Sequence, residues 1–177
     1  VGESEERLSL ALKGADLGIW DWDIKTGDVV YSDRWAEMIG YKPEELKPNI
    51  STWENLMHPD DNDEVFKALH AHFEDANKDY KVNFRFKCNS GDWKWIQACG
   101  MVVERDDLGK PIRMTGTHLD ITESKEAEER IKDLAKFPEE NKNPVYRVSR
   151  DGVLLYANSA AIKFTLKYQT DVGDKIP

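Results

Sequence analysis

Apolar and polar residues alternate most regularly between residues 80 and 88. One face of this segment carries tyrosine, valine, phenylalanine and cysteine, and the other carries lysine, asparagine and arginine. A two-residue period of this kind is typical of a half-buried antiparallel strand. Residues 93–104 and 112–121 have the character of partner strands, reached through the turns 89–92 and 106–111. This part of the chain therefore predicts three long antiparallel strands.

A shorter hairpin and several helices precede these strands. Residues 18–24 alternate and continue through a glycine turn into a short strand at 29–31. Helical spacing follows, with a short helix capped by Ser32 or Asp33, a single helical turn, and a longer helix after Pro59. Because strands and helices are segregated, we predict an α+β fold, a five-stranded antiparallel sheet with short helices on one face.

Two further helices flank the predicted sheet. An amphipathic helix lies within residues 1–17, and a charged exit helix begins at the capping residue Thr122 and ends near Lys136. Apolar residues on these two helices are candidate dimer contacts, and a homodimer is expected from them. They are Leu8 and Leu12 in the first helix and Ile131 and Leu134 in the second.

The end of the chain resembles its beginning. Residues 137–177 repeat the first hairpin and short helix at an offset of 125 positions, which aligns Gly27 with Gly152 and Tyr31 with Tyr156. So short a segment buries too little surface to fold alone, so we expect it to pack against the first domain or a neighbouring chain. The expected organisation is a helix at 1–17, a main domain at 18–121, a linker helix at 122–136 and a truncated second domain at 137–177.

Composition narrows the classes of function. The chain has 34 acidic and 25 basic residues, a net charge of −9, so nucleic-acid phosphates and anionic lipids would repel it. We therefore expect neither nucleic acid nor direct membrane contact. No apolar run approaches the roughly 20 residues of a membrane span, and a cytoplasmic location is the default.

The two cysteines are expected to be small buried residues without a disulfide. Folding the central hairpin about its 89–92 turn places Cys88 opposite Trp93 and Cys99 opposite Val82. This pairing leaves the two cysteines much farther apart than the roughly 7 Å that a disulfide bridges.

The sequence carries no catalytic or metal-binding constellation. Its four histidines lack zinc-site spacing and the context of a phospho-acceptor box, and no phosphate loop, cyclase motif or nucleophile elbow is present. His70 and His72 fall on the longer helix, and His72 lies on its apolar stripe, where a core or rim position is expected. We therefore expect no catalytic residues, no metal site and no enzymatic activity in this chain itself.

Several motifs nevertheless resemble those of the PAS domain and its C-terminal PAC segment. Trp-Glu-Asn-Leu-Met-His-Pro-Asp-Asp at 53–61 precedes the longer helix, and Phe-Arg-Phe at 84–86 with Gly-Asp-Trp-Lys-Trp-Ile at 91–96 resembles the central hairpin. Gly-Lys-Pro-Ile-Arg at 109–113 and Leu-Asp-Ile-Thr-Glu at 119–123 resemble the closing strand and its exit motif. The match spans about residues 5–124 and is most similar to the subgroup with a tryptophan in this hairpin.

The resemblance implies a sensory or signal-relay module of a multidomain protein, most often a sensor histidine kinase of a two-component system. Two alternatives remain open, a ligand-free dimerisation module and the sensor of a diguanylate cyclase. In either parent an output domain follows in the same chain. The candidate signal-coupling residues are Asp120, Ile121 and Thr122, because they join the last strand to the exit helix without slack. Asp120 and Thr122 can also form local hydrogen bonds that fix the angle of exit.

The resemblance further implies a small-molecule site between sheet and helices, although bulky rings could instead fill that space. Flavin-binding relatives need a cysteine in the helical region, whereas both cysteines here are on strands, and haem relatives use a histidine of the long helix. We therefore expect neither cofactor and leave the ligand unknown. The candidate pocket residues are Trp20, Trp35, Trp53, Phe84, Phe86, Trp95, Gln97 and His118.

Overall fold

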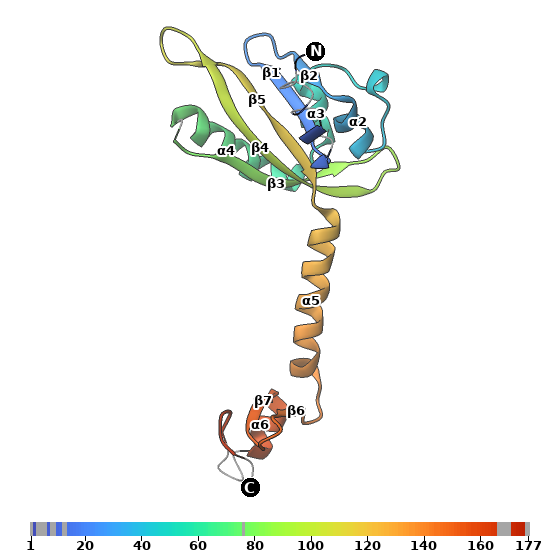
Figure 1. The fold of residues 1–177 in the computed structure, drawn as a ribbon, viewed down its shortest axis with the longest axis vertical. Helices are drawn as coiled ribbons and strands as arrows, with labels where there is room; N and C mark the ends of the chain where they lie inside the picture. Colours follow the sequence, from blue (N-terminus) through green and yellow to red (C-terminus); the bar gives the residue numbers. More distant parts are fainter. Residues whose placement is uncertain are drawn as a thin grey trace. The chain divides into compact units, whose positions relative to one another are not determined.

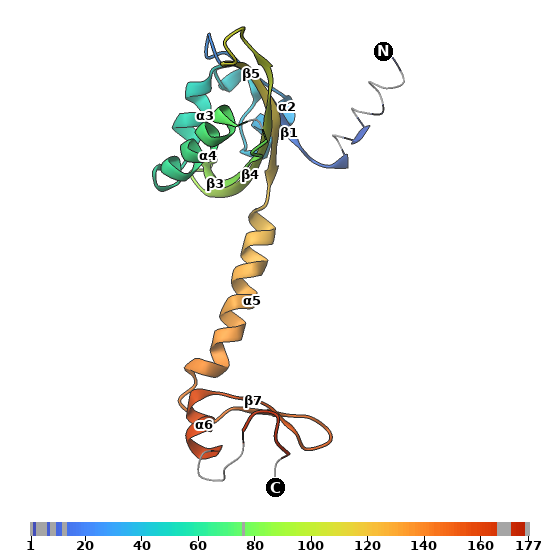
Figure 2. The same ribbon diagram turned by 90° about the vertical axis from the view of Figure 1, so that its left-hand side faces the viewer.

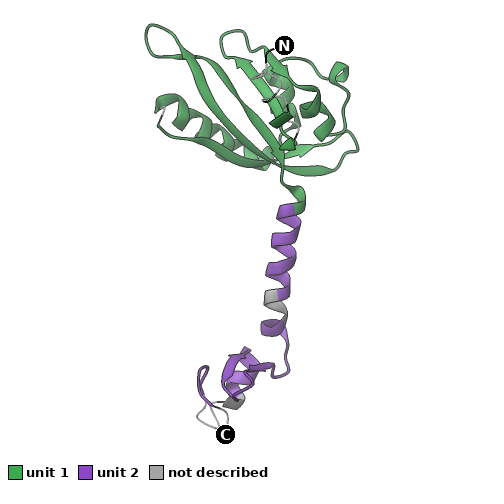
Figure 3. Cartoon of the chain, in the orientation of Figure 1, with its two compact units in different colours: residues 1–123 green, residues 124–177 purple. Residues whose placement is uncertain are grey.

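A computed structural model describes residues 2, 7, 10, 11, 14–75, 77–165 and 171–175, without the side chains of residues 135–137 and 164–165. The chain divides into two compact units, residues 1–123 and 124–177 (Figure 3). Leu8 and Leu12, the candidate dimer residues of the N-terminal helix, lie outside the described residues.

A five-stranded antiparallel sheet forms the centre of the first unit (Figure 1). The strands are β1 (Gly18–Asp23), β2 (Val29–Tyr31), β3 (Tyr80–Lys87), β4 (Trp93–Arg105) and β5 (Pro111–Asp120). Their order in the sheet is β2-β1-β5-β4-β3. β5 pairs with both β1 and β4, so the last strand, which leads to the exit helix, lies inside the sheet.

The helices of this unit are short, and α3 and α4 lie on one side of the sheet (Figure 2). They are α2 (Asp33–Met38), α3 (Ile50–Leu56) and α4 (Asn62–Glu74), with 3₁₀ turns at Pro43–Glu45 and Pro59–Asp61. This arrangement confirms the predicted α+β architecture.

Two local details differ from the sequence prediction. The tryptophan-containing segment before the longer helix forms α3, a separate helix whose Asn49 cap accepts a hydrogen bond from Ser51 N at 3.1 Å. Pro59 therefore opens a 3₁₀ turn and not α4 itself. Ser32 does stand at the N-cap of α2, but its hydroxyl accepts from Ile19 N of β1 at 2.9 Å and makes no side-chain cap.

The core lies between the helices and the face of the sheet that the alternation predicts to be apolar. The buried strand residues of this face are at most 7% exposed, and α2, α3 and α4 contribute Trp35, Trp53 and Leu69. The buried apolar residues from the strands are Trp20, Val29, Tyr80, Val82, Phe84, Phe86, Ile96, Ala98 and Met114.

The predicted pairing of β3 with β4 is wrong by one residue. Trp93 pairs with Lys87 and not Cys88, and Cys99 pairs with Lys81 and not Val82. The cause is the turn, where Gly91 adopts a left-handed backbone (φ 93°) and lengthens the loop beyond the two-residue turn that was assumed. Cys88 is buried, and Cys99 lies on the opposite face of the sheet from Ala98.

The second unit contains most of α5 (Thr122–Glu140) and a small hairpin–helix motif, β6 (Tyr146–Val148), β7 (Leu154–Ala157) and α6 (Ser159–Thr165). α5 ends at Glu140 and not near Lys136, and it includes Pro138. The longer helix is supported by Asn158, whose amide donates to Pro138 O in the last turn at 2.7 Å. The apolar core of this unit is Leu154, Ala157 and Ala161.

This motif has the same local structure as the first hairpin and α2, with one shift in alignment. Gly27 and Gly152 both adopt left-handed conformations, with φ of 81° and 82°, as the offset of 125 predicts. The strands, however, correspond at an offset of 126, because Tyr146 pairs with Ala157 as Trp20 pairs with Tyr31. A shorter turn and a register shift after Arg147 account for the difference.

Candidate functional site: an aromatic cavity and an exit junction

A cavity of about 30 Å³ lies in the core of the first unit. By volume it holds about two water molecules. Of the predicted pocket residues, Trp20, Trp53 and His118 line it. The sequence prediction missed the others, which are Trp22, Val29, Tyr31, Ile50, Leu69, Tyr80 and Met114.

Trp20 can lie against the sheet because two glycines face it on neighbouring strands. Trp20, Gly116 and Gly100 form one row across β1, β5 and β4. A Cβ atom on Gly116 would come within 2.4 Å of the Trp20 ring and 2.1 Å of the Cys99 carbonyl, and one on Gly100 within 2.5 Å of the ring. The indole therefore fills space that any larger residue at these positions would take.

His118 is the polar group at the centre of the aromatic cluster. Its Nδ1 accepts a hydrogen bond from Trp35 Nε1 at 2.8 Å, and the rings of Trp20, Trp35, Phe84 and Phe86 surround it at centroid distances of 5.6 to 6.0 Å. Burial lowers the pKa of His118 to about 3. The imidazole is therefore neutral at pH 7, and its proton resides on Nε2.

The remaining polar atoms of the cavity lining are mainly donors. Trp20 Nε1 and Trp22 Nε1 are buried and have no hydrogen-bond acceptor among the described residues. The hydroxyl of Tyr31 donates to Asn49 O at 3.1 Å, and burial raises the pKa of both Tyr31 and Tyr80. The lining therefore has no ionised group, and the surface that it presents is almost entirely apolar.

The other predicted pocket residues do not line the cavity. Trp35, Phe84 and Phe86 are at most 1% exposed and pack around His118. Trp95 and Gln97 lie on the opposite face of the sheet, since the buried face of β4 carries Ile96 and Ala98. Trp95 packs there against the guanidinium of Arg85, 5.4 Å from the ring centroid, and Gln97 donates to Asn83 Oδ1 at 3.1 Å. Neither the aromatic ring of Trp95 nor the amide of Gln97 therefore identifies the buried face of β4.

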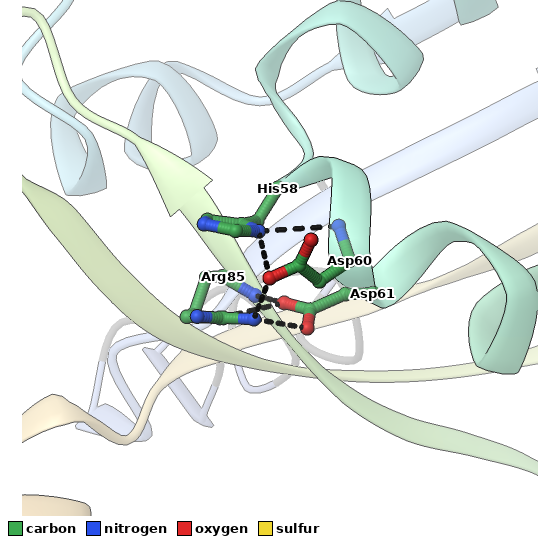
Figure 4. Close-up of polar contacts among 4 residues, drawn as sticks. All are labelled: His58, Asp60, Asp61 and Arg85. Atoms are coloured by element: carbon green, nitrogen blue, oxygen red, sulfur yellow. Dashed lines mark hydrogen bonds and ion pairs between the residues drawn. The ribbon is translucent and has the colours of Figure 1, made fainter.

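A second polar cluster fixes the helical wall of the cavity to β3 (Figure 4). Asp61 accepts two hydrogen bonds from the Arg85 guanidinium, at 3.0 and 2.6 Å, and one from Arg85 N. His58 N donates to Arg85 O, and His58 Nδ1 accepts from Asp60 N. Burial alone would raise the pKa of Asp61, but its bonds to Arg85 outweigh burial and lower it. Hydrogen bonds from the His-Pro-Asp-Asp motif thus hold the start of α4 to β3.

The predicted signal-coupling residues meet where β5 passes into α5. Asp120 Oδ1 accepts from Thr122 N at 3.0 Å and from its hydroxyl at 2.6 Å, which are the local hydrogen bonds expected from the sequence. Trp95 N donates to Thr122 Oγ1 at 3.0 Å, and Ile121 N donates to Trp95 O. The first turn of α5 is therefore bonded to β4 as well as to the end of β5.

Lys94, which the sequence prediction missed, links this junction to the helices. Its Nζ lies 2.9 Å from Asp120 Oδ2 and donates to Met38 O, at the end of α2, at 2.8 Å. Burial opposes ionisation of Asp120, but the bonds from Thr122 and Lys94 outweigh it and lower the pKa. α2 is thus bonded to His118 through Trp35 and to Asp120 through Lys94. No local pattern could reveal these contacts, because they join residues far apart in the chain.

Metal ligation and membrane insertion can be assessed for the described part of the chain. There, no three histidine, cysteine or acidic side chains converge so that they could hold a metal ion. His72 is buried, as its place on the apolar stripe predicts, with Nδ1 on Lys78 O and Nε2 accepting from Val102 N. His70 is exposed. No helix of the described residues has the length and apolar character needed to cross a membrane.

Comparisons with known proteins agree with this geometry. A family model described as PAS fold matches residues 28–118. The chain is 25% identical over 126 residues to the probable diguanylate cyclase DgcE of Escherichia coli K12, covering 71% of this chain and 11% of that protein. It is 27% identical over 123 residues to sensor protein FixL of Bradyrhizobium diazoefficiens, covering 70% and 24%. The chain thus spans at most about a quarter of these relatives.

A solved structure gives a stronger match. The sensory box histidine kinase/response regulator from Burkholderia thailandensis E264 is 36% identical, with a TM-score of 0.66. The match covers 74% of this chain and 96% of that chain.

Proposed function

Since the chain belongs to the PAS fold family, we propose that it is a signal-relay module that passes a change in its core to the exit helix α5. Its relatives include sensor histidine kinases and diguanylate cyclases, so it carries a sensor domain of the kind that both classes of protein contain. We favour a histidine kinase of a two-component system as the parent and keep a diguanylate cyclase as the alternative. The enzymatic activity would then belong to an output domain and not to this module.

One observation carries the relay proposal, the set of contacts that joins the aromatic core to the first turn of α5. Trp35 is bonded to His118 in the core, and three residues later the Met38 carbonyl is bonded to Lys94. Lys94 in turn pairs with Asp120, which holds Thr122. A displacement of α2 therefore acts on Asp120, Ile121 and Thr122 through strong, charge-assisted contacts.

The relay can be tested by perturbing the core and observing the exit. Trp35→Phe removes the donor to His118, and we expect it to shift the amide NMR signals of Trp95 and Thr122. In a Lys94→Met background the same change should no longer reach these two amides, since the contact with Asp120 is gone. Asp21→Asn is a matched control, because Asp21 pairs with Arg113 on the other face of the sheet. Unchanged exit signals in Trp35→Phe, with shifted signals at His118, would contradict the relay.

The cavity does not fit a flavin or haem. A volume of about 30 Å³ is far too small for a fused ring system, and the indole of Trp20 occupies the adjacent space over Gly100 and Gly116. None of the cavity-lining residues is a cysteine, and both ring nitrogens of His72 are engaged with backbone groups. We therefore propose that the module holds neither cofactor. Absorption spectra after reconstitution with each cofactor test this proposal, and a stoichiometric bound spectrum would contradict it.

If a small ligand binds, we propose that it is uncharged and carries hydrogen-bond acceptors. The unpaired donors of Trp20 and Trp22 favour such a group, and the lining offers no counter-ion for a charged one. Thermal-shift screens that compare small ketones with carboxylates of equal size test this preference. A larger shift with the carboxylates would contradict it.

Dimerisation through helices remains the alternative role. Ile131 and Leu134 of α5 are 67% and 73% exposed and are available to a partner helix. We propose a homodimer through α5, and Ile131→Lys with Leu134→Lys should reduce the mass measured by light scattering. Leu8→Lys with Leu12→Lys tests the N-terminal helix in the same way. An unchanged mass in both pairs would exclude these helices as the interface.

We also propose the domain organisation and location. The repeated glycine turn, strand pairing and helix start support residues 137–177 as the beginning of a second PAS domain, after the domain at 18–121 and the linker helix. The net charge of −9 supports a cytoplasmic module without nucleic acid or membrane partners.

A further inference from the structure

The second hairpin–helix motif differs from the first at one buried polar residue. Asn158 is 0% exposed and stands where Ser32 stands in the first motif. The side-chain Oδ1 of Asn158 accepts from Val145 N at 3.0 Å, and the backbone N–H of Asn158 donates to Val145 O at 3.1 Å. Ser32 makes the same two contacts with Ile19, at 2.9 and 3.0 Å. To form these two hydrogen bonds, the side chain at this position therefore needs only an acceptor atom.

The amide of Asn158 makes further contacts that a serine has no group to make. Its Nδ2 lies within hydrogen-bond distance of three carbonyl oxygens, those of Pro138 at 2.7 Å and of Asn141 and Asn143 at 2.9 Å. Pro138 belongs to the last turn of α5, whose carbonyls lack helical donors, and the other two follow the helix end. A single buried side chain thus binds the end of the linker helix to the hairpin.

Glu139 makes the reciprocal contact from the side of α5. One carboxylate oxygen accepts from the hydroxyl of Tyr156 on β7 at 2.6 Å. The other accepts from Ser159 N and Ser159 Oγ, at 3.2 and 3.1 Å, at the start of α6. The hydrogen bond from Tyr156 is the main cause that lowers the pKa of Glu139, and the same bond raises the pKa of Tyr156 to about 12.

These contacts matter because the apolar core of the motif is small. It consists of Leu154, Ala157 and Ala161, which cannot by themselves determine how the hairpin sits on the end of α5. Directional hydrogen bonds from a buried amide and a carboxylate can do so, because each requires a defined geometry.

We propose that Asn158 and Glu139 form a latch that holds the carboxyl end of α5 to β7 and α6, so that a movement of α5 is delivered directly to the second motif. Asn158 and Glu139 are thus positioning residues for the relay. The functional meaning of the latch rests on the proposed relay role of α5, whereas its existence can be tested alone.

The test uses the whole chain with two spin labels inside the second unit, and distances from pulsed electron resonance. Labels are attached through Glu129→Cys on α5 and Leu155→Cys on β7, both exposed positions, after Cys88→Ala and Cys99→Ser. A single narrow distance distribution is expected for the latched chain. Asn158→Ser places the residue of the first motif at this position, and it should broaden the distribution while protection of the Val145 amide is retained. An unchanged narrow distribution in Asn158→Ser would overturn the proposal.

Two further variants keep the test decisive if Asn158→Ser unfolds the hairpin. Asn158→Asp keeps the acceptor for Val145 but places an oxygen against the three carbonyls, so it should broaden the distribution as well. Glu139→Gln should return the pKa of Tyr156 from about 12 towards its ordinary 10.0 in an NMR titration. Glu140→Gln, at the neighbouring exposed position, is the matched control and should change neither readout. An ordinary Tyr156 pKa in the unmodified chain, or a narrow distribution in Asn158→Asp, would also overturn the latch.

Failure of the latch is distinguishable from failure of the relay. The spin-label distances concern only the second unit and require no signal in the first. Exit amides that do not respond to Trp35→Phe would contradict the relay while leaving these distances unaffected.

Discussion

The hairpin and short helix at residues 18–38 and their counterpart at 146–165 have the same local structure but different support. The first is paired to β5 and packs with a core of three helices and five strands. The second has a core of three small or medium apolar residues and is bonded to the end of α5 through Asn158 and Glu139. Local sequence can therefore specify a supersecondary motif, whereas its stability depends on what the motif is packed against.

The largest loss of stability is expected when the close packing of the first region is disturbed. Gly116→Ala adds a Cβ atom 2.1 Å from the Cys99 carbonyl and 2.4 Å from the Trp20 ring, so the sheet must move. We expect a loss of about 3 kcal/mol in the free energy of unfolding of the first unit. Urea titration followed by tryptophan fluorescence measures it, because all six tryptophans precede residue 96. Gly109→Ala, where φ is 79° and no atom lies within 4 Å, should cost about 1 kcal/mol. Equal losses in the two variants would contradict this explanation.

The second region should depend instead on its buried amide. Asn158→Ala leaves the Val145 and Ala161 amides without their acceptor, and we expect a loss of about 3 kcal/mol in the stability of the hairpin. Hydrogen exchange across residues 145–161 measures it, with β1 to β5 as the internal reference. Ser32→Ala removes a single hydrogen bond within a large core and should cost about 1 kcal/mol. A smaller loss of stability in Asn158→Ala than in Ser32→Ala would contradict this explanation.

Mild acid should reduce the stability of the first region more than that of the second, because all four histidines lie in the first. The folded pKa of His118, about 3, is below its unfolded value of 6.5. The unfolded state therefore binds the proton first, and the stability that His118 contributes is present above pH 6.5 and is lost as pH falls towards 3. Between pH 6.5 and pH 5 we expect the first unit to lose about 2 kcal/mol and the second to change little.

Tryptophan fluorescence in urea at several pH values measures the loss in the first unit, and hydrogen exchange measures the second. His118→Gln keeps an acceptor for Trp35 but cannot ionise, so it should abolish most of the pH dependence. Persistence of the full dependence in this variant would assign the effect to another group.

The smallest loss of stability should be the same in both regions and should come from their glycine turns. Gly27 and Gly152 have nearly the same left-handed φ, and added Cβ atoms would meet no atom closer than 3.4 Å. Gly27→Ala and Gly152→Ala should therefore each cost about 1 kcal/mol, through backbone strain alone. Hydrogen exchange of each hairpin gives both values. Clearly unequal losses would show that the two turns are not equivalent.

The residues that sequence reasoning placed correctly are those whose environment is decided by near neighbours. The alternation of residues 80–88 identified the buried face of β3, and the apolar stripe of α4 placed His72 in the core. Trp95 and Gln97 were placed on the wrong face, because a tryptophan can also be accommodated outside the core by stacking on an arginine.

By itself, the sequence determined the strands, the glycine turns, the local bonds of Asp120 with Thr122 and the repetition of the first motif. Each follows from periodicity or from hydrogen bonds between near neighbours. Only the tertiary structure decided that Gly116 and Gly100 make room for Trp20, that Lys94 joins Met38 to Asp120, and that Asn158 reaches back to α5. These contacts join residues that are 20 to 96 positions apart, on separate elements, and their geometry exists only once the sheet and helices are packed.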